Sequence, residues 1–311
     1  MEVRNGIAYS GDQAECGTLE QKIEHAITNN INYIQIRTKD IQDMITVDNK
    51  INKSKVDEFV SLLGKYSGTI SVHLPNPVWD YDNLNLSPKN ELLISIIKDL
   101  LLPIGIKDYT IHPHFSRQVY ESIGLEQRKE VLDKMSTYFS KVTNLGVNLA
   151  IENIPVRDLE KVKAMPESDK KQKALKNISY GMTIDEIENI INLTKSKVNQ
   201  GRVGMTYDTG HSLSMVEDEN IKKDVMDEWI EHFKNDIIIY HVAPKIGNEQ
   251  FGLREDVKEY DLDLIRFIYD ESERYNIDAL TFFEAHASFD KLTELNNISN
   301  EAKINIVRGN S

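Results

Sequence analysis

Several features are scarce in this chain of 311 residues, and each scarcity excludes a class of protein. Cysteine occurs once, at Cys16, so no internal disulfide can form, and we interpret this thiol as a bystander in a reducing compartment. No window approaches the roughly 20 apolar residues that a membrane-spanning helix needs. The segment MEVRNGIAYS also lacks the apolar core of a signal peptide. We therefore expect a cytoplasmic protein with no membrane partner.

Cationic residues are outnumbered as well. The chain has 37 lysines and arginines against 50 aspartates and glutamates, which gives a net charge of −13. Such a surface repels phosphate backbones, so a nucleic-acid partner is disfavoured, although a local basic patch stays compatible with this balance. Hydrophobic residues at 40% and charged residues at 28% are typical of a globular protein with a sizeable core.

Short apolar segments rich in β-branched residues recur along the whole chain. Their apolar residues are nearly continuous, so each segment is predicted to be a strand buried on both faces. Segments with helical spacing lie between them, and one of these opens on Thr183 followed by Glu186, the pattern of a capping box. The predicted strands cover residues 4–9, 31–37, 68–73, 108–114, 146–152, 202–208, 236–241 and 279–284.

The spacing of the strand ends predicts the fold. From Arg37 to Glu284, successive strand ends lie 33 to 43 residues apart, except for 56 residues between Glu152 and Asp208. One strand with its helix and loops needs at least about 30 residues. Eight such units predict an α/β protein with a single (β/α)8 TIM-barrel domain over residues 1–311. A doubly wound sheet is the alternative, but its glycine-rich first turn is not in the sequence.

The long interval contains a charged helical insertion after the fifth strand, at about residues 156–181. It combines many lysines with several acids, one proline and a weak apolar stripe. A solvated helix on the surface is one interpretation, because runs of charge usually face water. A lid is the other, because the segment follows a strand end, where barrel active sites are built.

Residues that bind divalent metals close six consecutive predicted strands, the third to the eighth. The carboxyl ends of parallel strands meet at one rim of a barrel, so side chains far apart in the sequence converge there. A single such residue is more often a helix cap. Burying six ionisable groups together is costly unless a metal neutralises them. The pattern indicates a site for Zn²⁺, Mn²⁺, Fe²⁺ or Co²⁺ rather than Ca²⁺, formed by His73, His112, Glu152, Asp208, His241 and Glu284.

Four short motifs resemble those of the xylose isomerase-like TIM-barrel superfamily. They occur in the same order along the chain as IEN (151–153), YDTGH (207–211), IIYHVAPK (238–245) and TFFEAH (281–286). This superfamily includes sugar and sugar phosphate isomerases and epimerases, inosose dehydratases and endonuclease IV. The resemblance runs from roughly residue 30 to residue 290 and is specific to the superfamily rather than to one member.

The resemblance implies a metal-dependent isomerase or epimerase that acts on a small sugar or sugar phosphate. Glu152, Asp208, His241 and Glu284 are similar to the ligands of one divalent metal, which would be Mn, Zn, Co, Mg or Fe. The metal would stabilise an enediolate. Glu152 and Glu284 resemble the catalytic pair that removes and returns a proton beside the carbonyl.

Further residues are candidates for binding substrate. The resemblance implies this role for His211, Lys245 and Arg254, and His114, the last residue of the fourth predicted strand, is a further candidate. Trp79 lies in the loop after the third strand, where an aromatic face could stack on a sugar ring, and packing within the loop explains it equally well. Exposed aromatic segments of this kind also leave a homo-oligomer open.

Two other functions remain open. His73 and His112 match positions that complete a second zinc site in endonuclease IV, bridged by the residue equivalent to Glu152, so a phosphodiester hydrolase with two Zn is the alternative. Residues 247–263 contain no histidine where endonuclease IV has an Asp-x-His pair, which favours the isomerase. A barrel that binds a ligand without catalysis is the third option, and the intact ligand set disfavours it.

Overall fold

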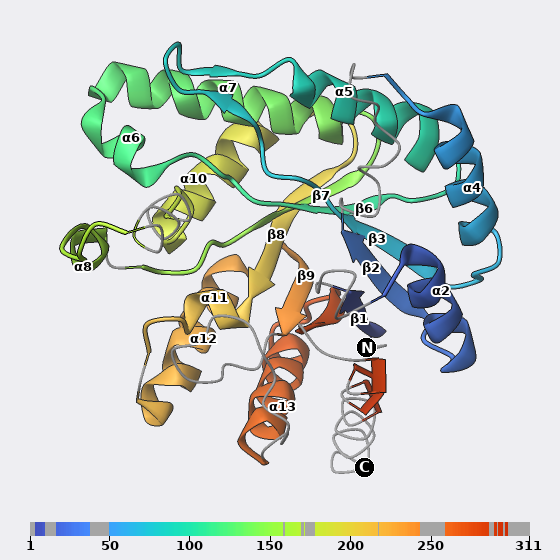
Figure 1. The fold of residues 1–311 in the computed structure, drawn as a ribbon. Helices are drawn as coiled ribbons and strands as arrows, with labels where there is room; N and C mark the ends of the chain where they lie inside the picture. The colour runs from blue at the N-terminus through green and yellow to red at the C-terminus, as the bar shows by residue number, and fades with distance from the viewer. Residues whose placement is uncertain are drawn as a thin grey trace.

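The computed structural model contains a closed barrel of eight parallel strands, and Figure 1 shows the helices arranged around it. The order around the barrel is β1-β10-β9-β8-β7-β6-β3-β2, so successive barrel strands are neighbours and the first pairs with the last. The predicted (β/α)8 barrel is therefore confirmed. The structure describes residues 4–9, 17–37, 50–157, 159–168, 171, 178–216, 218–242, 259–285, 289–290, 292–294 and 296–297.

All eight predicted strands form, with small differences at their ends. The fourth predicted strand is shorter than expected, because β6 ends one residue before His112 and the chain continues as a loop. The barrel strands are β1 (Arg4–Tyr9), β2 (Tyr33–Arg37), β3 (Thr69–His73), β6 (Asp108–Ile111), β7 (Asn148–Glu152), β8 (Arg202–Asp208), β9 (Ile237–Val242) and β10 (Leu280–Ala285).

Helices connect the strands, and a two-stranded hairpin after β3 was not predicted. This hairpin pairs β4 (Trp79–Asp80) with β5 (Asn85–Leu86). One short helix, α8, lies within the charged insertion after β7. The helices are α2 (Leu19–Thr28), α4 (Lys53–Leu63), α5 (Lys89–Ile96) with the π-helical turn η1 (Ile97–Leu101), α6 (Arg117–Ser122), α7 (Leu125–Thr143), α8 (Leu159–Lys163), α10 (Ile184–Lys195), α11 (Thr209–Ser212), α12 (Glu219–Phe233) and α13 (Glu259–Arg274).

The predicted cap of α10 forms in part. Thr183 accepts a hydrogen bond from the backbone N–H of Glu186, as a helix cap does. The Glu186 side chain does not complete a capping box. Its Oε2 instead accepts from the backbone N–H groups of Gly181 and Met182, and its Oε1 forms an ion pair with Arg117.

Side chains alternate between the two faces of each barrel strand, as the period of two along a strand requires. On β7, Leu149 and Ile151 belong to the large apolar core that includes α7 and α10. Ala150 belongs to a separate apolar cluster, with Phe282 of β10 among its members, and Glu152 reaches the rim residues described below. The two faces of one strand therefore serve different purposes, because the outer face anchors the helices and the inner face fills the barrel.

A chain of hydrogen bonds crosses part of the barrel interior below the rim. Gln35 donates to Ser71 and Thr110, at 3.2 and 3.1 Å, and the Thr110 and Thr206 hydroxyls are 3.0 Å apart. All four residues are buried. Each lies two residues before a rim residue, namely Arg37, His73, His112 and Asp208, so this polar layer supports the rim from below.

No helix among the residues that the structure describes is long and apolar enough to cross a membrane.

The polar layer predicts a stability effect that can be measured directly. Thr110→Val keeps the shape of the side chain but removes a hydroxyl that accepts from Gln35, so we expect the free energy of unfolding to fall by about 1–3 kcal/mol. Thr194→Val is the matched control, because its buried hydroxyl only donates to the Ile190 carbonyl inside α10. Chemical denaturation would compare the two variants, and equal losses would contradict a special role for the layer.

Candidate metal centre

The carboxyl end of the barrel gathers the polar strand-end residues at one rim. Asp208 of β8 and His241 of β9 pair directly across their strands, and Arg37 of β2 pairs with His73 of β3 in the same way. Because the strands are parallel, these pairs lie at the same end of the barrel as the ends of β7 and β10. Residues more than 200 positions apart in the sequence thus become neighbours.

Four of these residues converge closely enough to share one ion. The Nδ1 atom of His241 lies 2.9 Å from Glu284 Oε2, 3.1 Å from Glu152 Oε1 and 4.0 Å from Asp208 Oδ2. One ligand atom from each of the four residues falls within 4.8 Å of all the others. Ligands bound at about 2.0–2.2 Å to a single ion lie up to about 4.4 Å apart. The three distances from His241 fall within this limit, as those of a metal site would.

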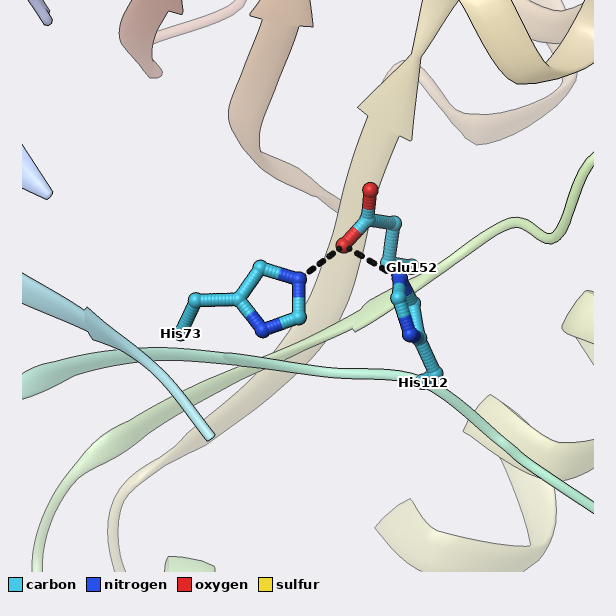
Figure 2. A group of neighbouring side chains, drawn as sticks. All are labelled: His73, His112 and Glu152. Carbon is cyan, nitrogen blue, oxygen red and sulfur yellow. Dashed lines mark hydrogen bonds and ion pairs between the residues drawn. The ribbon is translucent and has the colours of Figure 1, made fainter. Parts of the chain in front are cut away.

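A second group shares Glu152 with the first. Figure 2 shows the rings of His73 and His112 pointing at one carboxylate oxygen of Glu152. The Nε2 atoms lie 3.0 and 3.1 Å from Glu152 Oε2. Each ring has another partner at Nδ1, the Leu74 carbonyl for His73 and the Asn76 side-chain oxygen for His112. With a proton on Nδ1, each neutral ring presents an unprotonated Nε2 toward Glu152, which is the form that binds metals.

Burial and neighbouring charges shift the pKa values of the four-residue cluster in opposite directions. Burial would raise the pKa of Glu152 and Glu284, but the charges and hydrogen bonds of His241 with His112 at Glu152, and of His241 with Arg37 at Glu284, together outweigh it and hold both pKa values well below the ordinary range. Burial would lower the pKa of His241, but the two glutamates raise it well above the ordinary value. Burial raises the pKa of Asp208 to about 7, against the opposing effect of His211. Without a metal, the histidine proton therefore partly neutralises the carboxylates.

The donor set fits a divalent transition metal or magnesium. Three carboxylates and one imidazole form the four-residue cluster, and all four side chains are buried or nearly so. Buried carboxylates at this density need a cation to offset their repulsion and lost hydration. Mixed imidazole and carboxylate ligands suit Zn²⁺, Mn²⁺, Co²⁺ and Fe²⁺. Glu152, Asp208, His241 and Glu284 would hold such an ion.

Asp208 is held by a small network that involves its own helix. Its Oδ1 accepts the backbone N–H of His211 at 2.8 Å and so caps α11, while its Oδ2 faces His241. The side chain of Asn153 bonds to both backbone groups of Asp208, at 2.7 and 2.9 Å. His211 Nδ1 donates to the Asn153 carbonyl at 2.7 Å. The strand end is thus a helix cap and a member of the cluster at the same time.

The other predicted substrate-binding residues differ in where they lie. His211 is beside the cluster, with its Nε2 3.7 Å from Asp208 Oδ2. Trp79 is buried in the hairpin region, packed edge-on against Phe115, and its Nε1–H donates to the backbone carbonyl of His114. The structure therefore places Trp79 within the packing of the loop. Lys245 and Arg254 lie outside the described residues.

Two residues of the site were not predicted from the sequence. Asn153, fully buried, ties Asp208 and His211 together. Arg37, the last residue of β2, forms an ion pair with Glu284. Strand position could have indicated both residues, because Arg37 ends an apolar strand as the predicted metal ligands do, and Asn153 comes directly after Glu152.

Solved structures share this fold at low sequence identity. A D-tagatose 3-epimerase-like protein matches with a TM-score of 0.65 and 14% identity over 99% of both chains. A 3-keto-D-glucoside 4-epimerase from E. coli matches at 0.60 and 9%, over 97% of this chain and all of that chain. A xylose isomerase domain protein from Alicyclobacillus acidocaldarius matches at 0.59 and 11%, over 97% and 100%. The chain therefore shares the barrel fold of these proteins.

No protein-family model matches the sequence, and no curated protein matches it significantly.

The raised pKa of Asp208 predicts how metal binding depends on pH. A metal must displace the proton that Asp208 holds below about pH 7 and the proton on His241, so the affinity for Mn²⁺ should increase as the pH rises through about 7. Titration calorimetry in buffers of different ionisation enthalpy should detect the released protons. The Asp208→Asn variant should bind more weakly and release fewer protons. Affinity that is constant across this range, with no proton release, would contradict the assignment.

Proposed function

We propose that this protein is a divalent-metal-dependent isomerase or epimerase of a small sugar or sugar phosphate. The observation that carries the proposal is the convergence of Glu152, Asp208, His241 and Glu284 at the carboxyl rim of the barrel. Active sites of TIM-barrel enzymes lie at this rim. Several solved structures with this fold are of proteins named as epimerases of small sugars or as epimerase-like, including an L-ribulose 3-epimerase.

In this proposal the two glutamates transfer a proton between neighbouring carbons or between the faces of one carbon. Glu152 on β7 and Glu284 on β10 are separated by β8 and β9, and His241 of β9 contacts both. A substrate carbon held between them would have one carboxylate on each side. One glutamate would remove the proton beside the carbonyl and the other would return it.

Neighbouring residues would hold the substrate in place. His211 is partly exposed at the edge of the cluster, and its Nδ1–H is fixed by the Asn153 carbonyl, so the Nε2 of the neutral ring can accept a hydrogen bond from a substrate hydroxyl. A bound divalent ion would supply the polarisation of a carbonyl and its neighbouring hydroxyl that stabilises an enediolate. Lys245 and Arg254 stay predicted contacts to substrate.

A second candidate is a two-metal phosphodiester hydrolase, favoured by one specific observation. The group of His73, His112 and Glu152 is itself a potential metal site, and it shares the Glu152 carboxylate with the first cluster. A bridging carboxylate between two metals is suited to phosphodiester hydrolysis. If the protein is an isomerase, the same two histidines would hold the Oε2 atom of Glu152 and face the substrate. Zinc-dependent cleavage of bis(p-nitrophenyl) phosphate would support the hydrolase.

Solvent exchange tests the role of the glutamates. In D₂O with Mn²⁺, the wild-type protein should incorporate deuterium beside the carbonyl of a ketose from a panel of pentuloses and hexuloses. Glu152→Gln and Glu284→Gln should each slow this exchange by about 10²–10⁴-fold, because the amide cannot accept the proton.

The matched control is Glu271→Gln. Glu271 on α13 is as buried as Glu284, with 9% of each residue exposed, but it pairs with Arg274 away from the rim. Its variant should exchange deuterium at the wild-type rate. Unchanged exchange in folded Glu152→Gln and Glu284→Gln proteins would refute the assigned roles.

A further inference from the structure

The rim contains a cation that the proposed mechanism does not use. Arg37 ends β2, and its Nη2 forms an ion pair with Oε1 of Glu284 on β10. Strand β1 lies between β2 and β10, so the arginine side chain reaches across the end of β1. The residue of β1 that pairs with Glu284 is Ala8, whose small side chain leaves room for this contact.

The ion pair makes the two oxygens of Glu284 unequal. Oε1 is engaged by the guanidinium, while Oε2 lies 2.9 Å from His241 Nδ1, inside the four-residue cluster. A carboxylate held in this way offers one oxygen to a metal. It cannot turn its second oxygen inward without breaking a charge-assisted hydrogen bond, the stronger kind of hydrogen bond.

Glu152 is held by a different kind of partner. Among the residues that the structure describes, its oxygens face the imidazoles of His73 and His112 on one side and of His241 and His211 on the other. Imidazoles can gain and lose protons, whereas the guanidinium of Arg37 stays charged. The two glutamates are therefore restrained unequally, and the permanent restraint is on Glu284.

We propose that Arg37 is a positioning residue that holds Glu284 as a one-oxygen metal ligand. The inference rests on the metal site of the proposed function but does not require a particular substrate. Partners that orient metal ligands typically contribute 10–100-fold to metal affinity. Removing a cation beside a cation site would by itself tighten metal binding. The direction of the change therefore separates the two effects, because only lost positioning weakens binding.

Binding of Co²⁺ to the full-length protein tests the proposal. Arg37→Met and Arg37→Gln both remove the ion pair, and each should raise the Kd for Co²⁺ by about 10–100-fold. Both should also change the visible absorption of the bound Co²⁺, because Glu284 becomes free to offer both oxygens. Arg37→Lys restores a cation and should recover part of the affinity. If the methionine variant does not fold, the glutamine variant carries the same test.

Arg4→Met is the matched control. Arg4 begins β1 at the opposite end of the barrel, has a side chain with 33% exposure against 31% for Arg37, and pairs with Asp278 just before β10. It should bind Co²⁺ as the wild type does. Wild-type or tighter Kd values in the folded Arg37→Met and Arg37→Gln proteins would overturn the proposal. Weakened Co²⁺ binding without deuterium exchange on any ketose would leave Arg37 supported and refute the isomerase instead.

Discussion

Repulsion among three buried carboxylates is the constraint on which the rest of the site depends. Glu152, Asp208 and Glu284 lie around His241, and each would be costly to bury alone. The chain offsets this cost with a proton on His241, a guanidinium on Glu284 and backbone hydrogen bonds around Asp208. These groups neutralise the repulsion among the carboxylates only in part, as the raised pKa of Asp208 indicates. A divalent cation would complete the neutralisation, and this is the physical reason for proposing a metal-dependent function.

The interior of the barrel below the rim supports this cluster of buried charges. One part of the interior is apolar, including Ala150 and Phe282, and another part is the hydrogen-bonded layer that runs from Gln35 to Thr206. A layer with satisfied hydrogen bonds fixes the strand ends that it supports, and precise ligand placement needs rigid supports of this kind. Fold and site are therefore linked through the same alternation of side chains along each strand.

Much of the fold follows from local sequence, because buried parallel strands are continuous apolar runs that end at one rim. The same logic found the cluster residues, since Glu152, Asp208, His241 and Glu284 each close such a run. It missed Arg37, because arginine is not a metal ligand and only ligand types were considered. The hairpin around Trp79 was missed because its strands are two residues long, and the burial of this tryptophan depends on Phe115, a tertiary contact without a local signal.

Anomalous scattering from a crystal soaked with Mn²⁺ would test the central claim most directly. The account predicts one strong manganese peak per chain, within bonding distance of Glu152, Asp208, His241 and Glu284. A peak confined to His73 and His112, or no peak at the rim of a folded protein, would contradict the proposed metal centre. A second peak of equal strength between the two histidines and Glu152 would transfer support from the isomerase to the two-metal hydrolase.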